Sequence, residues 1–218
     1  MKVVNFGEQK SLVSQYMMEM RAVDMQHDPM RFRRNLQRVG EIMAYEISKT
    51  LRYEPREVIT PLAPCVCDRL AEQVVLGTIF RAGLPFHQGF LDYFDRAENA
   101  FVSAYRKYRE KEHDHFDILI EYLATPCLDG KTLILVDPML ATGGSMELSY
   151  RALLTKGTPA RIHLASVIAS RQAVDYLQRV MPENSTLWVG VIDPEINAHS
   201  YIVPGLGDAG DLAFGTKD

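Results

Sequence analysis

The sequence predicts an α/β fold in which a mainly parallel, twisted sheet is flanked by helices. Apolar runs with the length and composition of buried strands lie at residues 74–80, 133–136, 162–169 and 187–192. Segments with a helical spacing of apolar residues alternate with these runs, at residues 84–94, 146–156 and 171–180. Such alternation is typical of a parallel sheet whose faces are covered by helices.

The composition is that of an ordinary globular protein. The 218 residues are 47% hydrophobic and 24% charged, with no internal repeat, low-complexity tract or clear linker. We therefore expect a single domain over residues 1–218. The net charge of −4 argues against a generally basic surface for nucleic acid. A local basic cluster is expected to be the solvated face of a helix; it contains Arg31, Arg33, Arg34 and Arg38.

The cysteines and the hydropathy pattern indicate a reduced, cytoplasmic protein. Cys65, Cys67 and Cys127 are too few for a disulfide framework, and the Cys-x-Cys pair lacks the second ligand pair of a zinc site. The N-terminal stretch has no long apolar core, and no later apolar run is long enough to span a bilayer. We expect no membrane partner.

Two helices are predicted before residue 50. The first, through Asp24, carries an apolar stripe that predicts a core or subunit contact and consists of Leu12, Tyr16, Met20 and Val23. The second starts at Asp28 as N-cap, with Pro29 in its first turn. Its predicted core face recurs at three- and four-residue steps and consists of Phe32, Leu36, Val39, Met43 and Ile47.

Prolines dominate the stretch that follows. Pro55, Pro61 and Pro64 are expected to break any regular element, and the β-branched run at residues 58–60 predicts a short edge strand or an arm. Arms of this kind often make oligomer contacts. Together with the apolar stripe of the first helix, the arm predicts a homodimer.

Two predicted strands deliver arginines to one edge of the sheet. The strand at residues 74–80 ends at Arg81, and the strand at residues 100–105 ends at Arg106. The carboxyl edge of a parallel sheet is where ligands bind in such folds. The charged stretch at residues 107–115 is expected to be a solvated loop, a role compatible with a mobile active-site cover.

A turn signal predicts one antiparallel pair. Asp129-Gly130 separates the partly alternating run at residues 116–124 from the strand at residues 132–136. We therefore expect these two strands to pair as neighbours.

The central motif is a strand that runs into a turn of small residues. The apolar run at residues 133–136 ends at Asp137-Pro138, because proline has no N–H for a ladder. Small side chains follow up to the helix at residues 146–156: Ala141, Thr142, Gly143, Gly144 and Ser145. Free N–H groups at a helix start, aided by the helix dipole and by hydroxyls, bind anions such as phosphate. The alternative is a tight connection with ordinary capping by Thr142 or Ser145. No Gly-Lys-Ser/Thr follows, so ATP hydrolysis is not implied.

The C-terminal stretch at residues 201–217 is rich in glycine and apolar residues. Gly205, Gly207 and Gly210 have the spacing of a dinucleotide fingerprint, but Pro204 interrupts the strand that this motif needs. The glycines instead predict bare backbone that approaches a planar ligand, with Asp208 and Asp211 as nearby acceptors. A surface loop is the alternative, although the stretch is too apolar for a free tail because it contains Ile202, Val203, Leu206 and Phe214.

Three separated motifs carry a family resemblance: DPMLATGGS at residues 137–145, YIVPGLGDAGD at 201–211 and RAGL at 81–84. Together they resemble the type I phosphoribosyltransferase family, in particular its uracil-specific members. The resemblance implies that family's fold, with a small C-terminal base-recognition region. It also implies transfer of a phosphoribosyl group from 5-phospho-α-D-ribose 1-diphosphate (PRPP) to N1 of uracil, which yields UMP and diphosphate.

The resemblance also implies roles for individual residues. Arg81, Asp137 and Asp208 are implied to be catalytic, with Asp137 at the ribose hydroxyls and Arg81 and Arg106 at the diphosphate. The implied PRPP-binding set comprises Arg81, Arg106, Asp137, Pro138, Met139, Leu140, Ala141, Thr142, Gly143, Gly144, Ser145 and Asp208. Uracil is implied to contact Ile202, Gly207, Asp208 and Ala209. Mg²⁺ is the implied cofactor, bound mainly by the diphosphate and ribose hydroxyls rather than by a dedicated set of protein ligands.

Two departures from the family pattern concern the diphosphate side. Leu212 stands where a basic residue usually follows GDAGD, and residues 107–114 lack the usual acidic start. Two other functions stay open on the same fold. One is a non-catalytic, nucleotide-sensing RNA-binding regulator, which the charge of −4 disfavours, and the other is a phosphoribosyltransferase for a different base.

Overall fold

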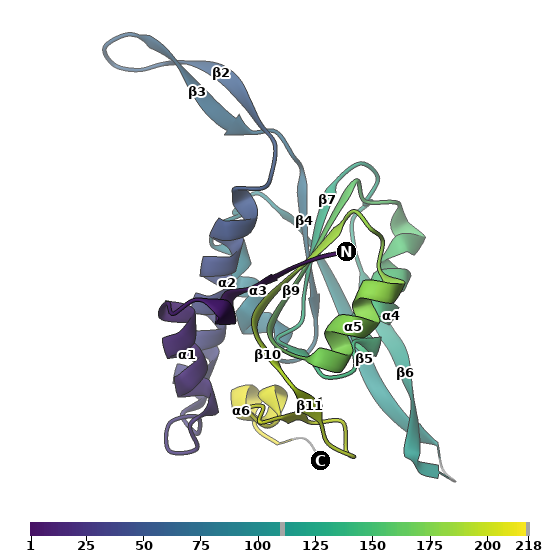
Figure 1. Cartoon of the computed structure of the whole chain (residues 1–218). Coiled ribbons are helices and arrows are strands. Elements are labelled where there is room, and N and C mark those ends of the chain that lie inside the picture. Colours follow the sequence, from purple (N-terminus) through teal and green to yellow (C-terminus); the bar gives the residue numbers. More distant parts are fainter. Residues whose placement is uncertain (110–111, 217–218) are drawn as a thin grey trace.

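A central sheet forms the body of the molecule (Figure 1). The computed structural model describes the backbone of residues 1–109 and 112–216, and the side chains outside residues 104–120. In spatial order the strands are β1 (Lys2–Asn5), β10 (Ser185–Asp193), β9 (Arg161–Ser170), β7 (Thr132–Val136), β4 (Val74–Ile79), β5 (Glu98–Arg109) and β6 (Glu112–Ala124). Neighbours are parallel except β5 and β6, and β8 (Met139–Leu140) adds beside β9. The predicted mainly parallel sheet is confirmed.

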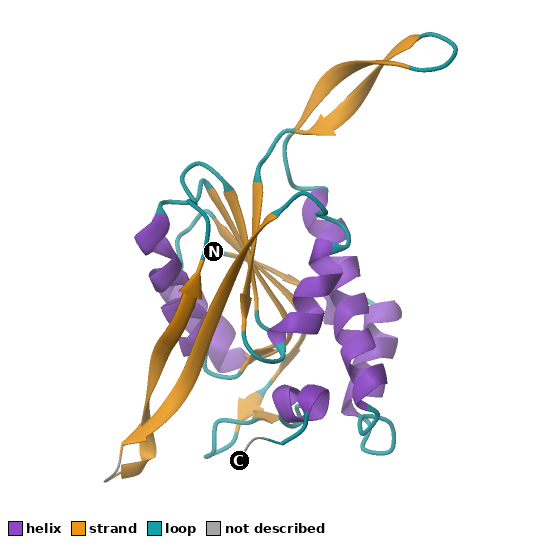
Figure 2. Cartoon of the chain, turned by 180° about the vertical axis from the view of Figure 1, so that it is seen from behind, coloured by secondary structure: helices purple, strands orange, loops and turns teal. Residues whose placement is uncertain are grey.

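Helices cover both faces of this sheet (Figures 1 and 2). One face carries α1 (Leu12–Arg21), α2 (Pro29–Ser48) and α3 (Gly83–Leu91), and the other carries α4 (Gly144–Leu153) and α5 (Arg171–Val180). Alternate residues of β7 enter opposite cores: Leu133 and Leu135 pack with α4 and α5, and Ile134 and Val136 with the other helices. Burial on both faces explains why the central strands have continuous apolar sequences.

The N-terminal helices are confirmed, with one correction. Asp28 caps α2 by accepting from the N–H groups of Met30 and Arg31, and all five predicted core residues of α2 are buried. In α1, however, Leu12 is 63% exposed, and Val23 is exposed because it lies beyond the end of the helix. The buried stripe of α1 instead consists of Val13, Met17 and Met20. The strand β1 and the short helix η1 (Phe6–Glu8), which precede α1, were not predicted.

The predicted arm is a two-stranded hairpin that projects from the body (Figure 1). It consists of β2 (Tyr53–Ile59) and β3 (Pro64–Leu70), which pair only with each other. The expectation that the prolines break any regular element is wrong, because Pro55 and Pro64 lie within these strands. A ribbon of two strands has two free edges, at which a missing N–H costs no ladder bond.

Two predictions about the side of the sheet formed by β5 and β6 are also wrong. Residues 107–109 and 112–115 are not a loop, because β5 and β6 continue as one long antiparallel hairpin. The partner of β6 is β5 rather than β7, which lies between β4 and β9. All of β7 is buried, so it needs neighbours on both sides, whereas charged strands suit a sheet edge. Arg106 is thus within a strand, opposite Ile118, and its side chain lies outside the described set.

The C-terminal stretch forms a small layer beyond one edge of the sheet (Figure 1). It contains the short strands β11 (Glu195–Ile196) and β12 (Ile202–Val203), which pair with each other, and helix α6 (Ala209–Phe214).

A short helix, η2 (Leu154–Lys156), prolongs α4 and ends at Gly157 as predicted. Within the described ranges, no helix combines the length and the apolar character that a membrane span requires.

Candidate functional site

The carboxyl ends of β4 and β7 lie side by side. These strands are parallel neighbours, with Thr78 level with Val136, so the loops that begin at Phe80 and Asp137 leave the same edge of the sheet. The Asp137 N–H donates to the carbonyl of Ala165 at 3.1 Å, and its Oδ1 accepts from the Met139 N–H at 3.3 Å. The two loops therefore begin at the same edge of the sheet.

The loop after β7 opens α4 through a glycine. Gly143 is the N-cap residue, with φ +83°, and α4 has no side-chain cap. The Thr142 hydroxyl accepts from the Gly144 N–H at a long 3.4 Å, and Ser145 lies inside the helix. Ser145 therefore does not cap α4, whereas Thr142 accepts one long hydrogen bond from the first residue of the helix.

Helix α5 supports this loop from behind. A Cβ atom built on Gly143 would lie 3.0 Å from Cδ1 of Tyr176 and 3.2 Å from Cγ of Leu177. Left-handed backbone and the lack of space both require glycine here. We call residues 137–145 the phosphate loop, and its shape is defined by the packing of α4 and α5.

Arg81 joins the edge of the sheet to the C-terminal layer. Its Nη2 donates to Oδ1 of Asp211 at 2.8 Å, and its Nη1 donates to the carbonyl of Gly215 at 3.3 Å. The RAGL motif and the GDAGD motif, which are 130 residues apart, therefore meet in space.

We call residues 201–211 the uracil-recognition segment, after the role that the family resemblance implies. Ile202, Leu206 and Ala209 are buried in the core beneath α1 and α2, whereas Gly207 is exposed. The Ala209 N–H donates to Sδ of Met139 at 3.4 Å, which links this segment to the phosphate loop. The two stretches that the sequence motifs single out are thus in contact.

Asp208 makes hydrogen bonds to the backbone at the start of α6. Its Oδ1 accepts from the N–H groups of Gly210 and Asp211 at 2.8 and 3.0 Å, so it is the N-cap of α6. The neighbouring Leu212, which stands at the family's basic position, is half-buried and packs against the core.

Sequence reasoning missed the residues that hold this segment from the N-terminal helices. Gln26 Nε2 donates to the carbonyl of Leu206 at 3.3 Å, and Arg33 Nη1 donates to that of Ala213 at 2.6 Å. Arg21 Nη2 donates to Asp193 Oδ1 at 2.8 Å, and Asp193 in turn contacts Gly205. Partners 172 to 180 residues apart leave no local signal in the sequence.

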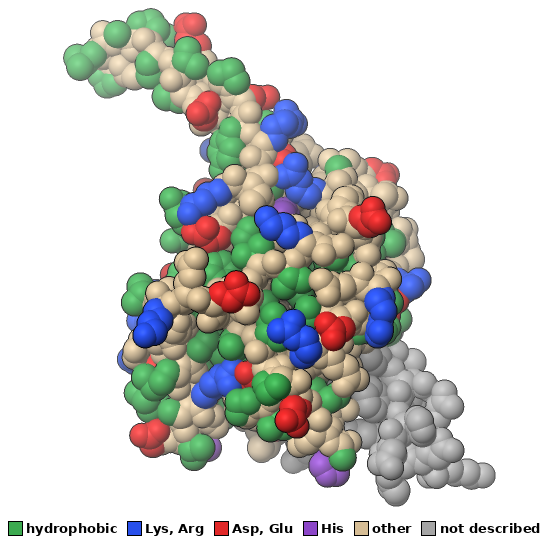
Figure 3. Space-filling model, in the orientation of Figure 1, with side chains coloured by type: hydrophobic (Ala, Val, Ile, Leu, Met, Phe, Trp, Pro, Cys, Tyr) green, Lys and Arg blue, Asp and Glu red, His purple; other side chains and the backbone are tan. Residues whose placement is uncertain are grey.

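The arginine cluster of α2 also has partners within the protein. Arg31 donates to Glu19, Arg33 to Ala213, Arg34 to Glu41 and Arg38 to Asn35. Basic and acidic side chains are interspersed on the face that Figure 3 shows. Arg31 therefore connects α2 to α1 and Arg33 connects it to the C-terminal layer, whereas the hydrogen bonds of Arg34 and Arg38 lie within α2.

Two buried ionisable groups have strongly shifted pKa values, and both lie away from the site. Hydrogen bonds from Arg31, Asn35 and Gln15 lower the pKa of Glu19 to about 2. Burial, with a smaller effect of Arg161, lowers the pKa of His163 to about 4. His163 accepts a hydrogen bond from Trp188 at 3.1 Å. In the part of the chain that the structure describes, no three His, Cys, Asp or Glu side chains are grouped to hold a metal ion.

A parallel sheet with a phosphate loop after a central strand, beside an arginine and a glycine-rich apolar segment, defines a protein of the phosphoribosyltransferase class. The sequence model of the uracil phosphoribosyltransferase family matches residues 7–216. The chain belongs to this family, which confirms the resemblance seen in its motifs.

Individual relatives agree with this assignment. The chain is 61% identical over 217 residues to uracil phosphoribosyltransferase from Porphyromonas gingivalis, with 100% of both chains covered. It is 41% identical over 192 residues to the enzyme of that name from Methanothermobacter thermautotrophicus, covering 86% of this chain and 85% of that one. A solved protein structure from Aquifex aeolicus superposes with a TM-score of 0.85 at 29% identity, covering 98% of each chain.

Proposed function

We propose that this chain is a uracil phosphoribosyltransferase that converts PRPP and uracil to UMP and diphosphate, a reaction of pyrimidine salvage. One observation carries the proposal: the phosphate loop meets the uracil-recognition segment through Met139 and Ala209, and Arg81, in the loop after β4, meets the same segment through its ion pair with Asp211. A substrate bound at each stretch would be close to the other. Membership of the family and the 61% identical relative support the choice of uracil.

The proposed roles follow the chemistry of each group. Backbone N–H groups and hydroxyls of residues 141–145 would hold the 5′-phosphate, and Asp137 would accept hydrogen bonds from the ribose hydroxyls. Arg81 and Arg106 would face the diphosphate. Backbone groups of Ile202, Gly207 and Ala209 would pair with the edge of uracil, whose O2 and O4 need donors and whose N3–H needs an acceptor.

The proposed reaction is displacement at the anomeric carbon of the ribose. Uracil N1 forms the new bond and loses its proton to water or to the leaving diphosphate, while the bond to the diphosphate breaks and the diphosphate takes the electron pair. The protein contributes by holding both substrates in line and by placing positive charge where the diphosphate leaves. Arg81 suits the second task, because its guanidinium is permanently charged and its side chain is 38% exposed.

Magnesium is part of the proposal. The residues at this edge fit such an ion, because Asp137 offers hard oxygen atoms of the kind that magnesium prefers and leaves most ligand positions to the substrate. When bound, the ion would neutralise charge on the diphosphate. The ion's own ligands would be mainly the diphosphate and ribose oxygens.

We further propose that one domain over residues 1–218 binds both substrates and acts as a homodimer in the cytoplasm. The arm supports the dimer, since it exposes apolar side chains that would otherwise remain in water: Tyr53, Ile59, Leu62 and Val66. Leu62, in the turn between β2 and β3, is 97% exposed. Figure 3 shows hydrophobic side chains along the surface of the arm. Light scattering should give twice the chain mass, and a monomer would contradict this.

A direct assay tests the proposed function. The purified chain is incubated with magnesium, PRPP and one nucleobase at a time, and diphosphate release and nucleotide formation are measured. We expect turnover with uracil and little with cytosine or purines. No turnover with any base would contradict the enzyme, and turnover with a purine alone would contradict the uracil assignment.

A further inference from the structure

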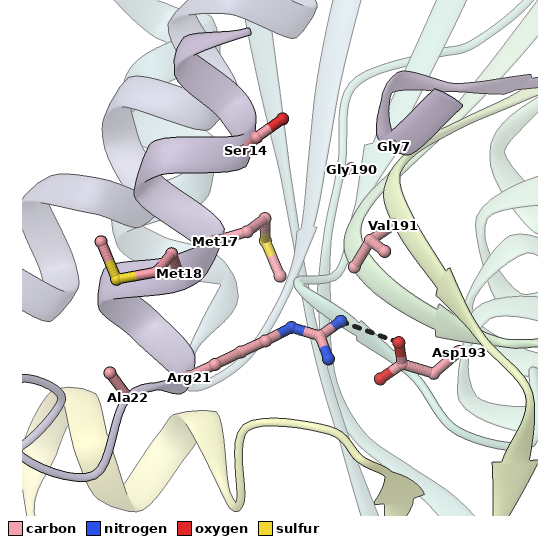
Figure 4. Close-up of a pocket in the computed structure, with 9 residues that line it drawn as sticks. All are labelled: Gly7, Ser14, Met17, Met18, Arg21, Ala22, Gly190, Val191 and Asp193. Atoms are coloured by element: carbon pink, nitrogen blue, oxygen red, sulfur yellow. Dashed lines mark hydrogen bonds and ion pairs between the residues drawn. The ribbon is translucent and has the colours of Figure 1, made fainter. Parts of the chain in front are cut away.

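Asp193 connects three parts of the molecule. It is the last residue of β10, it is 4% exposed, and each of its carboxylate oxygens has a partner. Oδ1 accepts from Nη2 of Arg21 at 2.8 Å, and Oδ2 accepts from the N–H of Gly205 at 2.9 Å. Figure 4 shows Arg21 reaching from α1 toward Asp193. The carboxylate therefore links the sheet, α1 and the uracil-recognition segment.

The backbone geometry at Gly205 fixes the direction of the hydrogen bond that Gly205 donates to Asp193. Its φ is +64°, and a Cβ atom there would lie 2.1 Å from the carbonyl oxygen of Ile202, so the turn is tight. The N–H of Gly205 thus has a defined direction, toward Asp193. Any shift of Asp193 should therefore move the backbone that leads to Gly207 and Ala209.

A second side chain holds the same two elements together. Gln26 Nε2 lies within hydrogen-bond distance of the carbonyls of Met20, Arg21 and Leu206, at 3.1, 3.2 and 3.3 Å. The end of α1 and the uracil-recognition segment therefore share a polar contact beside the one through Asp193.

We propose that Arg21 and Asp193 are positioning residues for uracil. Arg21 supplies the charge that a buried carboxylate requires, and Asp193 holds Gly205 and thereby the segment whose backbone would meet the base. This inference rests on the proposed function and adds residues to its uracil side. The phosphate loop has its own support in α4 and α5, so the pair should affect uracil and not PRPP.

A cavity of about 580 Å³ beside the pair allows a specific test. Its lining includes Met17, Met18 and Val191, together with Arg21 and Asp193 (Figure 4). Truncating Arg21 would leave space in this cavity where its guanidinium now pairs with the Asp193 carboxylate. A free guanidinium ion from solution could then enter and pair with Asp193.

The experiment compares steady-state kinetics of Asp193→Asn, Arg21→Ala and Arg21→Lys, with each substrate varied in turn. The KM for uracil should rise at least about tenfold in the first two variants, because each loses one charge-assisted hydrogen bond. The KM for PRPP should stay within about twofold, because the phosphate loop packs on α5, whereas Arg21 and Asp193 pair with each other and hold Gly205. Arg21→Lys should recover part of the uracil affinity, and millimolar guanidinium, but not sodium, should do so for Arg21→Ala.

A matched control separates positioning from general stability. The pair of Arg31 and Glu19 has a similar distance, 2.9 Å, and its carboxylate side chain is 6% exposed, like that of Asp193. Glu19 accepts only from Gln15, Arg31 and Asn35 among the described residues, all within α1 and α2. Arg31→Ala should lower the unfolding temperature without a change in the KM for uracil.

The outcomes distinguish the two proposals. If the unmodified chain does not turn over uracil, the proposed function is wrong. If it does and the KM for uracil is unchanged in Asp193→Asn, or rises equally in Arg31→Ala, the positioning role is wrong. If Arg21→Ala or Asp193→Asn fails to fold, Arg21→Lys provides the test. A ratio of the KM for uracil to the KM for PRPP equal to that of the unmodified chain would overturn the proposal.

Discussion

The phosphate loop and the uracil-recognition segment are neighbours in space but are built in different ways. The phosphate loop lies between β7 and α4, which adjoin it in sequence, and it packs on α5. The uracil-recognition segment and α6 are instead held by Arg21, Gln26 and Arg33, through contacts that span 172 to 180 residues. One half of the site thus depends on local structure, and the other depends on the docking of the N-terminal helices.

This difference predicts different sensitivities. Local structure in the central sheet should persist as long as the fold does, whereas a segment outside the sheet can loosen separately when a distant contact is lost. Substitutions should therefore divide into those that impair PRPP, those that impair uracil and those that impair both.

The largest effect is expected at Arg81, which lies in the loop after β4 and pairs with the uracil-recognition segment. Arg81→Ala removes the ion pair with Asp211 and the charge that would face the diphosphate. We expect kcat/KM to fall by about 100-fold or more, as for other lost electrostatic contacts to a developing charge. The unfolding temperature should change little, because this pair is partly exposed. Rates like those of the unmodified protein would show that Arg81 lies outside the active site.

Acid should weaken the sheet that supports both regions. Burial lowers the pKa of His163 from 6.5 to about 4 and lowers that of His87 as well, so between these pH values the unfolded chain binds more protons than the folded one. Stability should therefore fall as the pH drops from 6.5 to 4, with about 3 kcal/mol from His163. Chemical denaturation at several pH values measures this, and His163→Gln should flatten the slope. An unchanged slope would contradict the assignment.

A smaller effect is expected at the helix start of the phosphate loop. Gly143→Ala places a side chain at φ +83°, which costs about 1–2 kcal/mol, and it presses on Tyr176 and Leu177. The loop should shift, so the KM for PRPP should rise while the KM for uracil stays the same. Thermal unfolding and kinetics with each substrate varied would measure both effects. Gly130→Ala is the control, because Gly130 has a similar φ of +73° and open space around it.

The smallest structural effect is expected at Asp208, where two roles can be separated. Asp208→Ala removes the cap of α6, worth about 1 kcal/mol, together with the charge near the proposed PRPP site. Asp208→Asn retains an oxygen that can cap the helix and removes only the charge. If the charge contributes to catalysis, both variants should lose turnover, with Asn the more stable. Full activity in Asp208→Asn would leave capping as the role of this residue.

The sequence predicted those features that depend on neighbouring residues. The bounds of α5, the core face of α2 and the strand-turn-helix of the phosphate loop all follow from periodicity, caps and glycine. The strand that pairs with β6 could not be predicted in this way. The turn at Asp129-Gly130 is compatible with a hairpin between β6 and β7, but it is equally compatible with the observed connection from β6, at the edge of the sheet, to β7 in its centre. The contacts of Arg21 with Asp193 and of Arg81 with Asp211 require the assembled fold. The roles implied for Arg106, Asp137 and the backbone of Gly207 remain predictions.

The central claim is that two differently built regions bind two different substrates. Its most direct test is to measure the KM values for PRPP and for uracil in Gly143→Ala and in Asp193→Asn. We predict a crossed pattern, in which Gly143→Ala raises only the KM for PRPP and Asp193→Asn raises only the KM for uracil. Equal increases in both KM values in both variants would contradict the claim.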